Sequence, residues 1–142
     1  MKTKLFLILP LVFVSAAQAA PGKPMVSQDG KCVATVPANW GPAVTGVGME
    51  VPAGRSYARA KLRDGTMADY KALMTSMFKI TKTFEDSAAR YWIETGSQAD
   101  DTMHHWSVAV PGNGGVCEAT IGFDQSLGEA GAKSIALSVK QH

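Results

Sequence analysis

Two cysteines far apart in the chain, Cys32 and Cys117, place the strongest constraint on the fold. Each lies in a stretch whose apolar residues alternate as in a β-strand, "CVATV" and "VCEATIGF". A disulfide between them would tie an early strand to a late one, and closing so long a loop contributes on the order of 4 kcal/mol in the chain-entropy account. The spacing is not C-x-x-C, so it does not indicate a redox-active motif.

The first residues predict where these cysteines reside. Lys2 and Lys4 precede an apolar run over 5–14, and small residues follow up to Ala17-Gln18-Ala19, which is typical of a secretory signal peptide cut after Ala19. The run is too short for the roughly 20 residues of a membrane-spanning helix. We therefore expect a periplasmic or secreted protein with no membrane anchor, and a structural disulfide rather than two free thiols.

The remaining chain has the length of one domain. We expect a signal peptide over 1–19, a flexible mature N-terminus over 20–30 and a single α+β domain over 31–142. Without Lys2 and Lys4, the 14 Lys and Arg residues fall to the number of Asp and Glu residues, 12. A net charge near zero argues against a nucleic-acid partner.

Periodicity predicts the elements of this domain. A strand should end at Pro37, two short strands should flank 52–54, and residues 66–80 should form an amphipathic helix that begins with a capping box of Thr66 and Asp69. Further strands are expected over 82–86, 88–95 and a hairpin that turns at 111–115. A second helix should follow with Ser126 as its N-cap.

The hairpin decides how the helices pack. If its pairing is symmetric about Asn113, both faces of the sheet are apolar. One face then carries the Trp106 row, which is Trp106, Val108 and Val110, and the opposite face carries the Ala119 row, which is Ala119, Ile121 and Phe123. A sheet of this kind needs cover on both sides. The predicted fold class is α+β, a mainly antiparallel sheet with two helices packed on it.

This order of elements, with the stretch "VATVPANW" that contains Val36, Pro37 and Trp40, resembles the PsbP-like fold, which includes small bacterial periplasmic proteins. The resemblance covers most of the mature chain and implies a binding or adaptor protein. It implies no catalytic residue.

The segment "DDTMHHW" over 100–106 raises the question of a metal or proton-transfer site. Successive strand residues face opposite ways, so His104 and His105 should not ligate one ion. Met103 and His105 share a face and are weak candidates for a copper site, which would need further ligands. Asp100 and Asp101 with a histidine could serve acid–base chemistry. No G-x-S-x-G motif accompanies them, and we expect neither a cofactor nor catalytic residues.

Two groups of residues are candidates for partner binding. Arg55, Tyr57 and Arg59 alternate on one face of a predicted strand, together with Lys61, and could bind something acidic, or they form an ordinary solvated face. Trp92 shares a face with Arg90 and is either an exposed interface anchor or covered by a helix.

These observations predict a small exported protein that binds another protein in the periplasm, such as an immunity-type inhibitor of a toxin or an adaptor of an envelope complex. The alternative is a carrier of a small ligand or of copper, and a hydrolase comes third.

Overall fold

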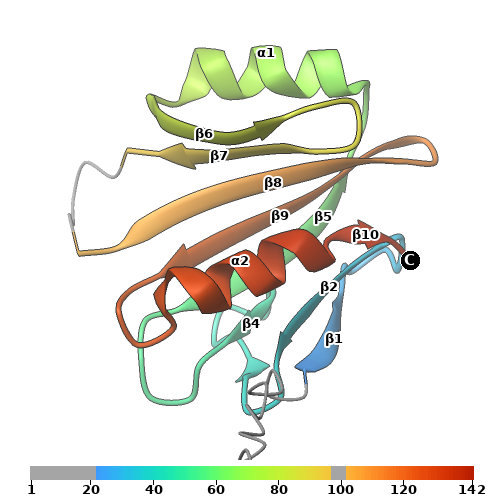
Figure 1. The fold of residues 1–142 in the computed structure, drawn as a ribbon. Helices are drawn as coiled ribbons and strands as arrows, with labels where there is room; N and C mark the ends of the chain where they lie inside the picture. Colours follow the sequence, from blue (N-terminus) through green and yellow to red (C-terminus); the bar gives the residue numbers. More distant parts are fainter. Residues whose placement is uncertain (1–21, 97–101) are drawn as a thin grey trace, which may run out of the picture.

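The computed structural model describes residues 22–96 and 102–142, which form one α+β domain (Figure 1). The helices are α1 (Met67–Met77) and α2 (Gly128–Ser138). The strands are β1 (Gly22–Val26), β2 (Cys32–Pro37), β3 (Gly41–Pro42), β4 (Met49–Glu50), β5 (Tyr57–Arg63), β6 (Ile80–Asp86), β7 (Tyr91–Thr95), β8 (His104–Gly112), β9 (Gly115–Phe123) and β10 (Lys140–Gln141).

The strands form two antiparallel sheets. The larger has the order β3-β4-β5-β9-β8-β7-β6 and the smaller the order β1-β2-β10. One face of the larger sheet packs against α2 and the smaller sheet, and the other face carries α1. The predicted fold class, an antiparallel sheet with two helices packed on it, is confirmed.

The main core lies between the larger sheet, α2 and β2. Trp106, Phe123 and Ile135 are among its buried side chains. The Cys32–Cys117 disulfide crosses this core and joins β2 of the smaller sheet to β9 of the larger one. The predicted covalent link between an early and a late strand is confirmed.

A second, smaller core lies beneath α1. The helix begins with the predicted capping box, in which the Asp69 backbone N–H donates to the Thr66 hydroxyl and the Thr66 backbone N–H donates to the Asp69 carboxylate. Tyr70 and Met74 are buried against β7, β8 and β9. Met77 and Phe78 of the predicted apolar stripe are instead 62% and 44% exposed, so the helix packs by a narrower stripe than the sequence predicts.

Two expectations about local structure are wrong. Residues 22–26 are not part of a flexible N-terminus but form β1, because Met25 inserts into the main core and β1 pairs along the whole of β2. Ser126 does not cap α2: its hydroxyl donates to Asp124, and the helix begins at Gly128 without a side-chain cap.

The β8–β9 hairpin also differs by one residue from the pairing considered above. Gly112 pairs with Gly115 and Trp106 with Ile121, so the Trp106 and Ala119 rows lie on the same face, in the main core. A shift of one residue moves a whole row of side chains to the other face of a sheet. The second face is nonetheless covered, because Tyr91, Ile93 and Val116 supply its apolar surface under α1.

Candidate functional site

The two adjacent histidines lie on opposite faces of the larger sheet, as strand alternation predicts. The Nδ1 atom of His104 lies 2.9 Å from the Oε2 atom of Glu94, and its ring stacks on Phe123. The Nδ1 atom of His105 lies 3.5 Å from the Tyr57 hydroxyl on the α1 side. Asp100 and Asp101 lie outside the described residues, so their expected acid–base role is not placed.

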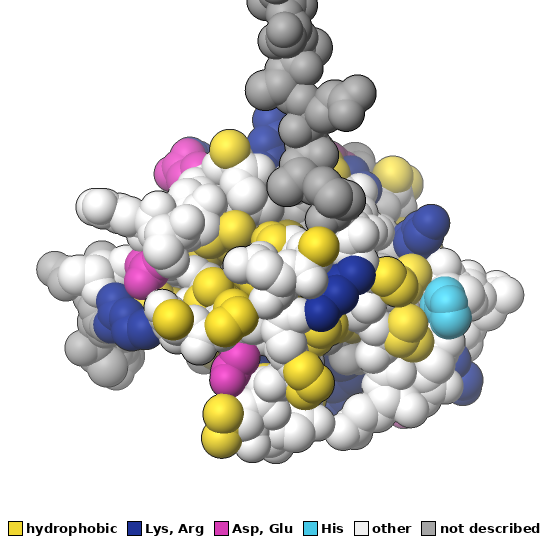
Figure 2. Space-filling model, turned by 90° about the horizontal axis from the view of Figure 1, so that it is seen from below, with side chains coloured by type: hydrophobic (Ala, Val, Ile, Leu, Met, Phe, Trp, Pro, Cys, Tyr) yellow, Lys and Arg dark blue, Asp and Glu magenta, His cyan; other side chains and the backbone are white. Residues whose placement is uncertain are grey.

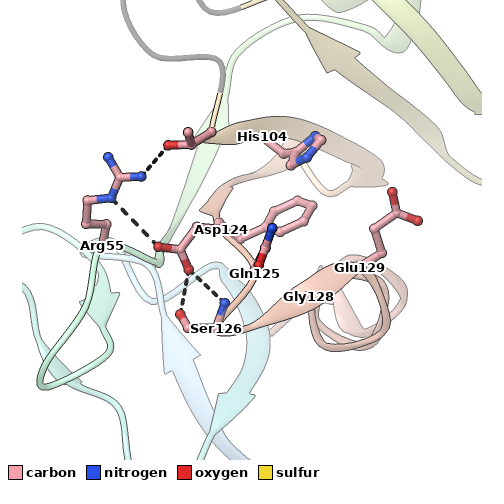
Figure 3. Close-up of a pocket in the computed structure, with 9 residues that line it drawn as sticks. Arg55, His104, Asp124, Gln125, Ser126, Gly128 and Glu129 are labelled. Atoms are coloured by element: carbon pink, nitrogen blue, oxygen red, sulfur yellow. Dashed lines mark hydrogen bonds and ion pairs between the residues drawn. The ribbon is translucent and has the colours of Figure 1, made fainter.

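A depression of about 710 Å³ lies beside His104 at the start of α2 (Figure 3). Several of its polar side chains are bonded to one another: Arg55 donates to the Thr102 hydroxyl at 2.5 Å and lies 3.7 Å from the Asp124 carboxylate. The hydroxyl and backbone N–H of Ser126 donate to the same carboxylate and hold the pKa of Asp124 below its usual value. The Ser126 hydroxyl thus donates its hydrogen bond to Asp124. Among the described residues of this depression, no serine is hydrogen-bonded to a histidine.

Glu94 organises the histidine side of this depression. Its burial disfavours the charged form, but hydrogen bonds from the Trp106 indole Nε1 and from His104, both 2.9 Å long, lower the pKa of Glu94 below its usual value. Across residues 22–96 and 102–142, no three His, Cys, Asp or Glu side chains come together as a metal site.

A second depression, of about 330 Å³, lies on the opposite face at the C-terminal end of α1. We call it the α1 depression. One wall consists of Met74 and Phe78 of α1. Another side is lined by Tyr57 of β5 and His105 of β8. The other lining residues are Arg63, Thr95, Gly96, Ser107, Glu118 and Thr120.

The floor of the α1 depression is polar although it is buried. Thr95, Ser107 and Glu118 line it, and they are three of the five buried polar or charged residues in the described chain. Glu118 is 5% exposed, and its Oε1 atom accepts a hydrogen bond from Arg63 Nε at 2.9 Å. Because a buried charge is costly unless it is paired, this ion pair allows a carboxylate to lie inside the sheet.

Tyr70 lies behind this floor. Its side chain is 3% exposed, and its hydroxyl has no hydrogen-bond partner among the described residues. Burial, and then the negative charge of Glu118, raise the pKa of the Tyr70 hydroxyl far above its usual value. The phenol is therefore neutral and can still donate and accept a hydrogen bond.

The same face continues past the depression along β5. The surface that we call the open sheet face consists of Tyr57, Arg59, Lys61 and Arg63 of β5 with Thr120 of β9. It is open because α1 packs on only one end of β7, β8 and β9. The Arg59 guanidinium lies over the Tyr57 ring, 5.0 Å from its centre. Leu73, Met77 and Phe78 form an exposed apolar rim on α1.

The structure divides the predicted partner-binding residues. Tyr57 and Arg59 lie together on the open sheet face, whereas Arg55 lines the depression beside His104. Of the two alternatives for Trp92, the exposed anchor is wrong and the covered side chain is right, since Trp92 is 6% exposed and stacks on Phe84 in the main core. Arg90 is bonded to the Glu85 carboxylate and to the Leu137 carbonyl oxygen of α2, so it links the β6–β7 turn to that helix.

The floor of the α1 depression was not predicted from the sequence. One signal was present: Glu118 is the sole charged residue of the apolar strand "GVCEATIGF". A charged side chain at such a position indicates a buried partner or a site. Ser107 and Arg63 carried no comparable signal.

Fold and site thus define a disulfide-linked α+β protein whose sheet carries a polar depression beside an uncovered face. Neither helix described in residues 22–96 and 102–142 is long and apolar enough to cross a membrane. A comparison with protein-family models and with curated proteins finds no match to the chain. The resemblance to the PsbP-like fold therefore stays a prediction.

Proposed function

We propose that this chain is an exported protein without catalytic activity that binds another protein through its open sheet face. The predicted signal peptide and the disulfide support export. An immunity-type inhibitor of a toxin and an adaptor of an envelope complex are the two forms of this function that suit a small periplasmic domain.

The observation that carries the proposal is the composition of the open sheet face. Tyrosine and arginine are the residues most enriched at the energetic centres of protein interfaces, and here Tyr57 and Arg59 stack on each other. Phe78 of α1 lines the same depression as Tyr57, and Leu73 and Met77 also expose apolar surface on α1. Apolar area next to aromatic and guanidinium groups is the chemistry of a contact with another protein.

The charges on this face favour an acidic partner surface. Arg59 and Lys61 are exposed, and neither forms an ion pair with another described residue. Arg63 is already paired with Glu118. Carboxylates of a partner would find two cations that the side chains of residues 22–96 and 102–142 leave without an ion pair.

Exposed apolar surface is not confined to α1. Val44 and Val47, in the turn between β3 and β4, are 93% and 40% exposed. Hydrophobic side chains are also visible among scattered charged ones at the end of the molecule that lies below β4 in Figure 1 (Figure 2). Val44 therefore serves as a control position on a different exposed apolar surface, against which contact at the open sheet face can be compared.

Site-specific photo-crosslinking tests the proposal. A benzoylphenylalanine is introduced in place of Lys61 on the open sheet face, in place of Val44, or in place of Lys133 on α2, and the full chain with its leader is expressed in its source cells. We expect one discrete adduct from position 61 and none from positions 44 and 133. An adduct from position 44 or 133, with none from position 61, would contradict the assignment of this face.

A further inference from the structure

We infer that the α1 depression receives a tyrosine side chain of the partner, flanked by acidic residues. This inference rests on the proposed function and names the chemistry of the segment that is bound. It starts from the floor of the depression, where Thr95, Ser107 and Glu118 are each at least nine-tenths buried.

The floor favours a group that both donates and accepts hydrogen bonds. Ser107 and Glu118 line the depression, and the Tyr70 hydroxyl is buried next to them; buried polar groups of this kind are destabilising where they are left unpaired. An anionic group would be repelled by the Glu118 carboxylate, and a cationic group would compete with Arg63 for it. A neutral hydroxyl can accept from one of these groups and donate to another.

The walls favour an aromatic body for the same ligand. Met74 and Phe78 face the depression from α1, and the Tyr57 ring lines it from β5. Thioether and aromatic groups both pack favourably against a further ring. A cavity of roughly 150 Å³ already holds benzene, so the α1 depression, at about 330 Å³, has room for a phenol.

The flanks of the bound segment follow from the neighbouring strand. Tyr57 and Arg63 line the depression, and Arg59 and Lys61 lie between them in sequence on the same face of β5. Residues before and after an inserted tyrosine would pass close to these two cations. Aspartate or glutamate is therefore expected at those positions.

Three capped peptides test each part of this inference by ¹H–¹⁵N NMR titration of the mature, disulfide-bonded protein. Acetyl-Asp-Tyr-Asp-amide should shift the backbone amides of Ser107, Glu118 and Thr120 in a saturable manner. Acetyl-Asp-Phe-Asp-amide, which lacks the hydroxyl, should bind about tenfold more weakly. Acetyl-Lys-Tyr-Lys-amide should also bind more weakly, because its charges oppose Arg59 and Lys61. Equal affinity of the Tyr and Phe peptides, or shifts elsewhere or none at all, would overturn the inference.

Protein variants test the inference through the ratio of the affinities for the Tyr and Phe peptides, which a general loss of stability would not change. In Ser107→Ala the preference for Tyr over Phe should fall toward one, while the Phe peptide binds as before. Phe78→Ala should weaken the Tyr peptide about tenfold. Leu137→Ala is its matched control, because Leu137 and Phe78 are 46% and 44% exposed and Leu137 lies on α2, across the sheet. An unchanged Tyr preference in Ser107→Ala, or equal losses in the two alanine variants, would count against the inference.

The two proposals can fail separately. Crosslinking at position 61 requires contact at the open sheet face but no tyrosine in the partner. If position 61 crosslinks specifically while the Tyr and Phe peptides bind alike, the tyrosine pocket is wrong and the proposed function stands.

Discussion

Two buried tryptophans offer a sharp test of the core, because their indole nitrogens have opposite surroundings. Trp92 and Trp106 are 6% and 2% exposed, and their rings meet edge to face with centroids 5.2 Å apart. The Trp106 Nε1 atom donates to the Glu94 carboxylate at 2.9 Å. The Trp92 Nε1 atom is buried with no hydrogen-bond partner among the described residues.

Replacing each tryptophan by phenylalanine trims a similar amount of ring, so the difference between the variants isolates the nitrogen. Trp106→Phe removes a hydrogen bond to a charged acceptor, which is worth about 1.5–3 kcal/mol. Trp92→Phe removes an unpaired buried donor, whose presence costs about 1–3 kcal/mol. We therefore expect the free energy of unfolding to be lower for Trp106→Phe than for Trp92→Phe by at least about 2 kcal/mol.

Urea unfolding at neutral pH, followed by far-ultraviolet circular dichroism with the disulfide intact, measures this difference. With a denaturant slope of about 1–3 kcal/mol/M, the two midpoints should differ by roughly 1 M. Trp92→Ala serves as a reference for emptying the core site and should cost about 3–5 kcal/mol. Equal midpoints for the two phenylalanine variants, or a lower one for Trp92→Phe, would refute the argument from the indole nitrogens.

Three further predictions concern the disulfide, the carboxylate network and metal binding. The denatured, unreduced mature protein should contain no free thiol, and a Cys32→Ser, Cys117→Ser double variant should lose about 4–5 kcal/mol of stability, since the bridge spans 85 residues; two titratable thiols per chain would contradict the first expectation. Because the folded state lowers the pKa of Glu94, its contribution is present above the unfolded value of 4.5 and is lost as pH falls through the lower folded pKa; unfolding free energies measured across that range should decline less steeply in Trp106→Phe. Titration with Cu(I), Cu(II) or Zn(II) should show no one-to-one site tighter than micromolar, and such a site, abolished in His105→Ala, would prove this expectation wrong.

The sequence alone was sufficient for features that depend on near neighbours in the chain. The capping box of Thr66 and Asp69 is local chemistry, and it appears in α1 as expected. Alternation around Cys32 and Cys117 placed both residues on strands, and the signal-peptide pattern made their pairing the natural expectation. Strand alternation by itself also predicts that His104 and His105 lie on opposite faces, as they do.

Other features depended on how the elements meet. The pairing of Gly112 with Gly115 was misjudged although Asn113-Gly114 is the local signal of a two-residue hairpin turn, and that shift of one residue determines which face each core row occupies. The sequence left both burial and exposure open for Trp92, and packing against Phe84, Trp106 and α2 buries it. The stretch that contains Met25 has a composition that predicted flexibility, but it forms β1 because Met25 packs into the main core.

The α1 depression shows the same division most clearly. The sequence displayed Glu118 as an isolated charge in an apolar strand, and it displayed Tyr57 and Arg59 on one face of another. It could not show that Ser107, Glu118 and Met74 would surround one depression, because these residues come from β8, β9 and α1. Their proximity arises from the antiparallel order β5-β9-β8 and from α1 covering only part of that face, and such long-range arrangement is set by packing rather than by local preference.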